Sequence, residues 1–375
     1  MLACYWGANN LERFKKVLAT TLLWGCVFTL LMAVGGIFFL DRILTMIQTP
    51  TALFQDTKQY LIIIFSGLIF IYLYNLFSAV FRAIGDSNTP LIILMVSMVL
   101  HVVMGYVFVA IFPFRVIGLA MGTVISQVFS VILCAILLFR EYSQIRLSKK
   151  EFRTSGFIFK LAAEYGCIAS FQQSSIFIGK VLIQTIISRC GINAIAAYTA
   201  CATLDSFVSS IGSSGDSTMS VFIGQNAGNS NQERIRKGFK EGSLLFVSIG
   251  VGVAILLLLF PQQLLSIFVS EGDAQVFKMG VGYLRTIAVF YIITYWSNIM
   301  NGYLRGIGKI GVPFLGSSIQ IFFRVVISYF LISSTSLAGL AIASGAGWSI
   351  QMVFLAWTVV TCLKQDVEVS TKILT

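Results

Sequence analysis

The sequence predicts an all-α polytopic membrane protein made of two helical-bundle repeats in parallel orientation. Of the 375 residues, 57% are hydrophobic and 11% are charged, a balance far from that of a soluble globular domain. The apolar residues form continuous runs of about 20, the length of a membrane-spanning helix. A ten-residue stretch also recurs, with several shorter ones, in the second half of the chain, which indicates a duplication.

The repeated stretch reads FRAIGDSNTP at 81–90 and LRGIGKIGVP at 304–313. Its arginine, its invariant glycine and its proline return 223 positions later: Arg82, Gly85 and Pro90 as Arg305, Gly308 and Pro313. Asn75 anticipates Asn298 at the same offset. The first residues of the chain also resemble the loop GNSNQERIRK at 228–237, at an offset of 221.

Ten apolar segments are long enough to cross a bilayer as helices. We place them at 17–40, 60–81, 91–112, 116–139, 157–188, 192–224, 243–260, 281–303, 312–332 and 337–363. The stretch 140–155 links the halves. Most of the 26 Lys and Arg residues fall on one set of alternating loops, so the net charge of +11 reports membrane orientation rather than a nucleic-acid partner. We expect a multi-pass protein of the cell membrane with both termini in the cytoplasm.

The offset between copies divides the chain into an N-terminal lobe, 1–145, and a C-terminal six-helix lobe, 146–375. In the second copy the loop at 228–237 follows two apolar segments, whereas almost nothing precedes its equivalent in the first copy. We therefore expect four helices in the first lobe, which would lack its first two, and six in the second.

Motifs of soluble enzymes are absent from the sequence. It has no phosphate-binding loop, one histidine, and seven cysteines that stand singly, so neither ATP hydrolysis nor a metal centre is predicted. We expect no enzyme activity and no cofactor. A transporter of this kind would use an ion gradient, of H⁺ or Na⁺, or downhill flow.

Charged residues within the spans are the first candidate functional residues, because a charge at bilayer depth must be paired or face water. Asp205 and Asp216 are eleven residues apart on one segment, close to three full turns, which places both carboxylates on one helix face. Lys180 could neutralise one of them, and Glu164 lies near the cytoplasmic end of its span. The functional interpretation is an ion-coupling track in which Asp205 leads, with Asp216 and Lys180 as possible partners. The structural alternative is an Asp205–Lys180 ion pair, with Asp216 near the interface.

Polar side chains within the spans form the second set of candidate functional residues. They must find partners away from lipid, and we expect several to line a substrate cavity: Asn75, Gln172, Gln173, Tyr295, Asn298, Asn301 and His101. Helix–helix hydrogen bonding would explain most of them equally well. Asn75 and Asn298 stand out because the duplication puts them at equivalent depth. For His101, a packing role and a proton-carrier role both remain open.

The repeated stretch itself predicts a tight turn between two spans. Its arginine ends one span, its glycines allow the turn, and its proline begins the next span, where a missing N–H group costs nothing. We expect a structural or hinge role, rather than substrate contact, for Arg82, Gly85, Pro90, Arg305, Gly308 and Pro313.

The stretches at 74–94 and 301–314, with VFIGQNAGNSNQERIRKG at 221–238, resemble the multidrug and toxic compound extrusion (MATE) family. The resemblance implies twelve helices in two lobes with a cavity between them, and export of amphipathic, often cationic, compounds in exchange for H⁺ or Na⁺. Several sodium-coupled members place a Glu in the seventh helix and an Asp in the tenth. This chain has Gln172 and Gln173 in the former and Asn298 and Asn301 in the latter, so Asp205 or Asp216 would have to take that role.

We therefore expect a secondary antiporter that acts on a small-molecule substrate within the lipid bilayer, as a monomer, by alternating access of its lobes. One rival is a flippase for a lipid-linked precursor, which would need several cationic residues in its cavity, where only Lys180 and Arg324 are available. A second rival is a non-transporting truncated product. A membrane enzyme is the least favoured interpretation.

Overall fold

The computed structural model describes residues 1–112, 115–153, 155–269 and 274–364, without the side chains of Arg115 and of residues 332–336. Within these ranges the chain is helical and contains no strand, which confirms the predicted all-α class. It divides into two compact units, Leu2–Ala162 and, with Met1, Ala163–Thr375. We describe each unit by itself, and the predicted lobe boundary at 145/146 stays a prediction.

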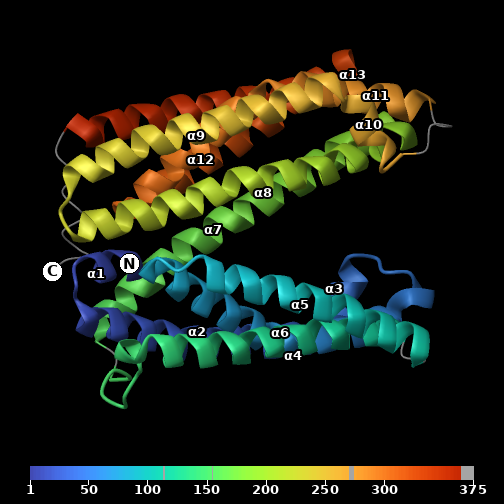
Figure 1. Cartoon of the computed structure of the whole chain (residues 1–375). Helices are drawn as coiled ribbons and strands as arrows, with labels where there is room; N and C mark the ends of the chain where they lie inside the picture. Colours follow the sequence, from blue (N-terminus) through green and yellow to red (C-terminus); the bar gives the residue numbers. More distant parts are fainter. Residues whose placement is uncertain (113–114, 154, 270–273, 365–375) are drawn as a thin grey trace. The chain divides into compact units, whose positions relative to one another are not determined.

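The first unit is a bundle of four long helices with two short ones at its edges (Figure 1). Its helices are α1 (Leu2–Gly7), α2 (Leu11–Phe38), α3 (Leu40–Met46), α4 (Thr51–Ile84), α5 (Asn88–Tyr106) and α6 (Arg115–Glu141). Helix α4 packs against both α2 and α6, and α5 packs against α6. A π-helical turn, Val107–Ile111, continues α5.

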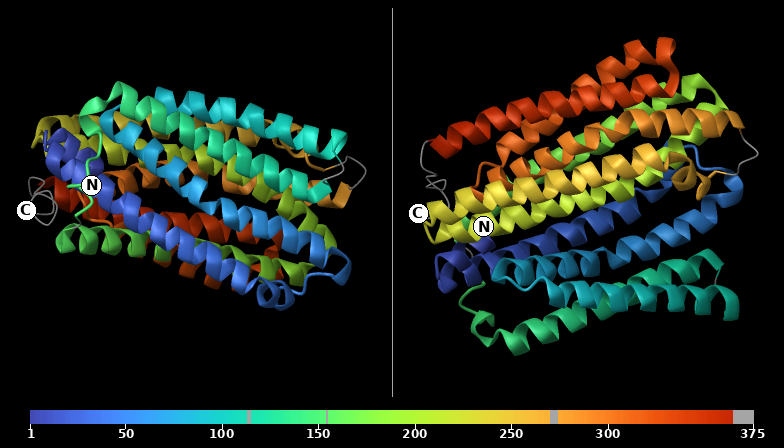
Figure 2. Two further views of the ribbon diagram at one scale, coloured as in Figure 1. Left: turned by 90° about the horizontal axis from the view of Figure 1, so that it is seen from below. Right: turned by 45° about the horizontal axis from the view of Figure 1, so that its top comes forward.

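The second unit is built around α12, which packs against α8, α9 and α13. Its helices are α7 (Gly156–Ile187), which begins in the first unit, α8 (Ile192–Gly228), α9 (Gln232–Leu259), α10 (Pro261–Ser266), α11 (Ala274–Ala288), α12 (Phe290–Gly306) and α13 (Gly311–Lys364). Figure 2 shows the long helices of this unit from two further directions.

The described residues contain nine helices that are long and apolar enough to cross a membrane, and ten candidate spans when the bent pair α11 and α12 is counted as one. These match the ten predicted segments in order. At the predicted span 281–303 the structure has two helices, α11 and α12, that meet at a bend of 49°. No proline lies in that stretch, so the sequence carried no local signal of the bend.

Helix α13 contains two candidate spans, Gly311–Leu331 and Leu337–Lys364. Glycines on each half lie against the other half. A Cβ atom at Gly316 would lie 3.3 Å from a methyl group of Leu355, and one at Gly347 would lie 2.7 Å from the carbonyl oxygen of Gln320. The second span therefore runs back along the first.

The repeated stretch forms the same turn in both copies. Gly85 and Gly308 have left-handed backbone angles, with φ of 98° and 86°. In each copy the glycine amide donates to the carbonyl three residues earlier, and the next amide donates to the carbonyl five residues earlier, at 3.1 and 2.9 Å in the first copy and 3.0 and 2.8 Å in the second. This pair of bonds is a Schellman motif, so the prediction of a glycine-dependent helix-to-helix turn is confirmed.

A second turn also recurs, before α2 and before α9. Asn9 and Ser230 have positive φ angles of 52° and 53°. The next residue in each copy, Asn10 or Asn231, caps its helix by accepting a hydrogen bond of 3.0 Å from the amide three residues later. The predicted duplication at an offset of 221 is therefore visible in the backbone.

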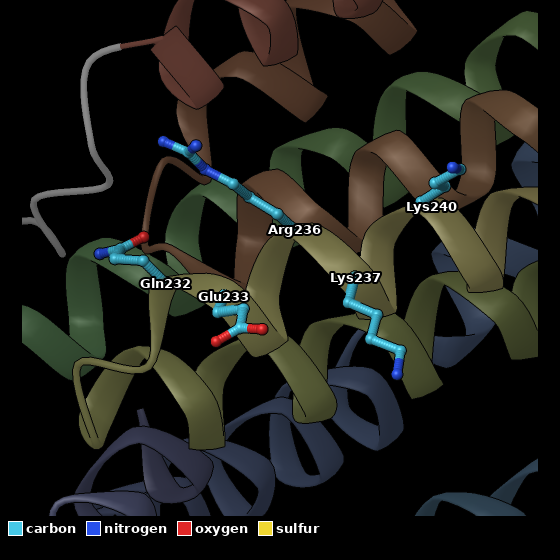
Figure 3. Close-up of a pocket in the computed structure, with 5 residues that line it drawn as sticks. All are labelled: Gln232, Glu233, Arg236, Lys237 and Lys240. Carbon is cyan, nitrogen blue, oxygen red and sulfur yellow. The ribbon is translucent and has the colours of Figure 1, made fainter.

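Basic side chains follow the second of these turns. Arg236, Lys237 and Lys240 border a groove of about 600 Å³ on the first turns of α9, with Gln232 and Glu233. Figure 3 shows Arg236 and Lys237 extending away from each other. This surface belongs to one of the cation-rich loops from which the sequence predicts the orientation in the membrane.

Close helix packing positions the functional residues of the second unit. Gly302 and Gly306, four residues apart on α12, both lie against α8: the former contacts Asp216 and Met219, and the latter contacts Ser220 and Ile223. Residue numbers therefore rise together along the two helices, which run in the same direction. Small residues at this spacing allow close backbone approach between membrane helices.

Candidate functional site

An ion pair within the candidate spans joins α8 to α12. Arg305, in the last turn of α12, places its Nη1 atom 2.8 Å from Oδ2 of Asp216. The Asp216 side chain is 13% exposed and the Arg305 side chain 36% exposed. Because Gly302 lets the two backbones approach one turn earlier on α12, the arginine reaches the carboxylate directly.

Arg305 also connects this ion pair to two further helices. Its Nη2 atom donates to Oε1 of Gln172 on α7 at 2.9 Å. The amide of Gln172 in turn donates to Oγ of Ser317 at 2.8 Å and to the carbonyl of Pro313 at 3.3 Å, both on α13. Asp216, Arg305, Gln172 and Ser317 thus form one network, here called the Asp216 network, that links four helices.

Among the polar side-chain atoms of α8 and α12 that are buried without a hydrogen-bond partner in the described residues, two are oxygens that can only accept. They are Oδ1 of Asp216 and Oδ1 of Asn301, and Asn301 lies one helical turn before Arg305 on α12. A buried acceptor that lacks a donor costs roughly 1–3 kcal/mol, and more if it is charged. A proton or a cation at Asp216 would remove that cost.

Asp205 occupies a second, aromatic environment on α8. The hydroxyl of Tyr291, in the first turn of α12 just after the bend, donates to Oδ1 of Asp205. The ring of Tyr291 packs against Trp348, with centroids 5.7 Å apart. The hydroxyl of Tyr198, whose ring meets Tyr283 edge-on at 5.9 Å, accepts a 3.5 Å hydrogen bond from Arg324.

The structure therefore places both aspartates of α8 towards α12, as the eleven-residue spacing predicts, but each has its own partner. The expectation that Lys180 neutralises one of these aspartates is wrong. Its side chain is exposed, and its ammonium group lies 5.7 Å from the ring centroid of Phe177. The preceding residue, Gly179, faces α13 at Ile321, so Lys180 lies about 100° away around α7. Glu164 is exposed near the start of α7.

The residues predicted to line a cavity fall into buried and exposed groups. Tyr295, Gln172 and Asn301 are buried, and the Tyr295 hydroxyl donates to the carbonyl of Val208 on α8 at 2.8 Å. Asn298 and His101 are half-buried. Gln173 is exposed, and so is Asn75, whose amide donates to a carbonyl of its own helix at 2.8 Å. Their role in binding substrate stays a prediction.

The predicted hinge residues differ between the two copies. Arg82 donates to Oγ of Ser78 within its own helix at 2.6 Å, and the carbonyl of Pro90 accepts a 3.3 Å bond from Tyr74. Arg305 instead belongs to the Asp216 network. Sequence reasoning did not pair Arg305 with Asp216, and Tyr291 and Ser317 were not among its candidates. The sequence signal that could have identified Tyr291 and Ser317 is that each is a polar residue within an apolar run.

The link between the halves is held to the first repeated turn. The hydroxyl of Tyr142 lies 3.5 Å from Oδ2 of Asp86, whose other oxygen accepts bonds from the amides of Asn88 and Thr89 at 3.1 and 3.0 Å. Partial burial, followed by the negative charge of Asp86, raises the pKa of Tyr142. Tyr142 therefore stays protonated and able to donate throughout the neutral range.

The described residues contain no group of three or more His, Cys, Asp and Glu side chains that could hold a metal ion. The polar groups within the spans instead comprise isolated carboxylates with arginine or tyrosine donors. Such a carboxylate can bind and release a proton or a monovalent cation, which changes its attraction to the paired donor.

Comparison with known proteins identifies the family. The MatE family profile matches residues 1–107 and 169–330. The probable multidrug resistance proteins YpnP and YoeA of Bacillus subtilis are each 28% identical to the chain, over 278 and 305 residues. These matches cover 73% and 79% of the chain but 61% and 64% of the relatives. The chain thus spans less than two thirds of the length of these curated relatives.

Solved structures show the same fold. A MOP superfamily transporter from Pyrococcus furiosus superposes with a TM-score of 0.90 at 20% identity, covering 97% of this chain and 82% of that one. An outward-facing multidrug resistance MATE family transporter gives 0.89 at 19% identity with the same coverage. The predicted fold class and resemblance are confirmed, and members of this family are transporters rather than enzymes. On the profile match over most of its length, the chain belongs to the MatE family, the multidrug and toxic compound extrusion transporters.

Proposed function

We propose that this chain acts in the cell membrane as a secondary active transporter, exporting amphipathic, often cationic, small molecules in exchange for H⁺ or Na⁺. Family membership supports transport, and the relatives are named as probable multidrug resistance proteins. The cation-rich loops support an orientation with both termini in the cytoplasm. We also expect the transporter to be a monomer. Because the relatives are longer, activity, substrate and partners are proposed for the protein as a whole.

The observation that carries the coupling part of the proposal is the Asp216–Arg305 ion pair inside candidate spans. A carboxylate at bilayer depth is retained only where it is paired or takes part in transport. Asp216 keeps one oxygen on Arg305 and one without a donor. It therefore holds a negative charge in place and still offers an acceptor to an incoming ion.

Ion binding at Asp216 changes the partner that Arg305 prefers. When a proton or a cation neutralises the carboxylate, the attraction of the guanidinium to it falls, and Gln172 remains as its hydrogen-bond acceptor. Gln172 is tied to Ser317 and Pro313 at the start of α13. The charge of Asp216 is thereby linked to the turn between α12 and α13, the segment that the sequence predicts as a hinge.

Asp205 is the second carboxylate in the proposal. The hydroxyl of Tyr291 stabilises its charge by donating to it, and the ring of Tyr291 in turn packs against Trp348. A carboxylate next to aromatic faces is a suitable environment for an organic cation. We therefore assign ion coupling first to Asp216 and treat Asp205 as the carboxylate nearer to the aromatic side chains.

The test is dye efflux from proteoliposomes that contain the full chain and an amphipathic cationic dye such as ethidium. An imposed pH gradient and an imposed sodium gradient are compared. We expect one of them to drive efflux, and Asp216→Asn to abolish that dependence. Asp41→Asn is the matched control, because Asp41 forms an ion pair of 2.7 Å with Lys58 in the first unit, and its side chain is 60% exposed.

Two results would contradict the proposal. If neither gradient drove efflux by the folded protein, secondary transport of this substrate class would be wrong. If Asp216→Asn kept full gradient dependence, the transporter could stand but the assignment of coupling to Asp216 would not. Movement of a lipid-linked precursor without dye efflux would favour the flippase alternative.

A further inference from the structure

A groove lies between two spans of the second unit, away from both aspartates. Helices α7 and α13 touch at Gly179, where a Cβ atom would lie 2.7 Å from a methyl group of Ile321. Beyond this contact the helices border a groove of about 360 Å³. Its lining includes Leu182, Ile186, Val325, Val326, Tyr329 and Arg189.

The groove has an apolar body and one charged end. Apart from Thr185, the groove-lining residues of α7 that precede Arg189 are aliphatic, and those of α13 are aliphatic or aromatic. Arg189 belongs to the short turn Ser188–Cys190 that follows α7. The groove therefore combines a long hydrophobic surface with a single cation, an arrangement that matches the two parts of an anionic lipid.

The position of the groove along the membrane normal also suits an anionic lipid. The candidate spans that form it are Gly156–Cys190 and Gly311–Leu331, so Arg189 and Tyr329 lie within two residues of the ends of their spans. Span ends lie at the boundary between hydrocarbon and headgroups, where Arg and Tyr side chains are favoured. The cation is thus placed at headgroup level, and the apolar lining extends from it towards the hydrocarbon.

The charge of Arg189 is also available. The residue is exposed, and no carboxylate in the part of the chain that the structure describes forms an ion pair with it. On our topology its turn belongs to the loops that are sparse in Lys and Arg, so Arg189 does not contribute to the cation excess that sets orientation. A phosphate group is a good partner for an exposed guanidinium, because it accepts two parallel hydrogen bonds.

We propose that this groove is a binding site for an anionic phospholipid, with an acyl chain between α7 and α13 and the phosphate on Arg189. The site is separate from the Asp216 network and does not depend on the proposed transport activity. The lipid is held by both of its parts, so a soluble phosphate does not satisfy the whole groove, and a zwitterionic lipid is held less well because its ammonium group offsets the charge of its phosphate.

The experiment measures lipid retention by native mass spectrometry of the full chain. Phosphatidylglycerol and phosphatidylcholine with identical acyl chains are offered in equal amounts, and soluble glycerol phosphate is offered separately. We expect preferential retention of phosphatidylglycerol and no retention of glycerol phosphate. Arg189→Gln should abolish the preference. Val326→Trp, which fills the groove, should reduce the retention of phosphatidylglycerol.

Matched variants and outcomes separate this site from general lipid contact. Val353→Trp alters a residue of α13 outside the groove that is 65% exposed, and Lys278→Gln removes an exposed cation elsewhere in the unit. Both should keep the preference. Equal retention of the two lipids by the unaltered protein, or a preference that survives Arg189→Gln, would overturn the proposal. Loss of the preference in Lys278→Gln would also do so, because it would indicate attraction by overall charge. Thermal unfolding verifies that each variant is folded. If Val326→Trp does not fold, Arg189→Gln alone carries the test.

Discussion

The guanidinium of Arg305 lies 2.8 Å from the carboxylate of Asp216. Arg305 belongs to the repeated turn, and Asp216 belongs to α8, twelve positions before the end of that helix. The contact joins two features that the sequence presents as unrelated, a hinge and an ion-coupling carboxylate. It also defines which variants should be energetically coupled.

Arg305→Gln should lower the free energy of unfolding in detergent by about 2 kcal/mol, the range for losing a hydrogen bond to a charged group. It leaves Asp216 charged without its partner. Adding Asp216→Asn should recover part of the loss, giving a coupling energy in a double-mutant cycle. Arg82→Gln is the control, because Arg82 bonds Ser78 on its own helix and should cost less. Strict additivity of the Arg305 and Asp216 variants would show that the pair is not an energetic unit.

Gly85→Ala and Gly308→Ala should each cost about 1–2 kcal/mol, since both glycines have positive φ angles and a Cβ atom is strained in that region. Gly282→Ala is a matched control within α11, where a Cβ atom meets nothing within 4 Å; it should be neutral or slightly stabilising. Equal midpoints of thermal unfolding for all three variants would contradict the left-handed assignment.

Gly302→Ala should destabilise the second unit through overpacking by about 1–3 kcal/mol. The added methyl group would lie 2.8 Å from Cβ of Met219 and close to the carbonyl of Asp216, so α8 and α12 would have to move apart. Gly252→Ala, on α9 with nothing within 4 Å, controls for helix propensity. In transport assays Gly302→Ala should also weaken coupling, because it displaces Asp216 from Arg305; an unchanged gradient dependence would argue against close packing as the cause of that contact.

Tyr291→Phe should cost about 1–3 kcal/mol, because the half-buried Asp205 carboxylate loses a hydrogen-bond donor. The double variant with Asp205→Asn should be less destabilised than additivity predicts. Tyr295→Phe serves for comparison, since its hydroxyl donates to a carbonyl rather than to a carboxylate. Should Tyr291→Phe unfold at the temperature of the unaltered protein, the hydroxyl would contribute nothing to Asp205.

The sequence was sufficient for the spans, the repeat and the turns, because each depends on local properties. Apolar length determines a span, and a glycine followed by a proline-initiated helix determines the turn at Gly308. Partner choice within the membrane was harder. Lys180 was a reasonable partner for Asp205 by charge alone, yet Gly179 fixes α7 against α13 and directs the lysine outward.

The Arg305–Asp216 pair depends on how α8 and α12 approach each other, and that approach is set by glycines spread over 95 positions of the chain, from Gly212 to Gly306. No periodicity within one segment reports it. The sequence likewise carries no local signal of the bend before Tyr291, because the stretch lacks the proline that would have marked it. Side-chain pairing across helices is therefore the part of the site that required coordinates.

The two Schellman turns carry opposite charges at the same backbone position, Asp86 in one copy and Lys309 in the other. The two hydrogen bonds of the Schellman motif use only the amide of that residue, so its side chain can differ between the copies; in the first copy the Asp86 carboxylate also accepts from the amides of Asn88 and Thr89. Asp86 reaches Tyr142 in the link between the halves, whereas the Lys309 ammonium contacts the sulfur of Cys362 near the end of α13 at 3.2 Å. A single inherited loop geometry has thus become two distinct attachment points, each holding a different downstream segment of the chain.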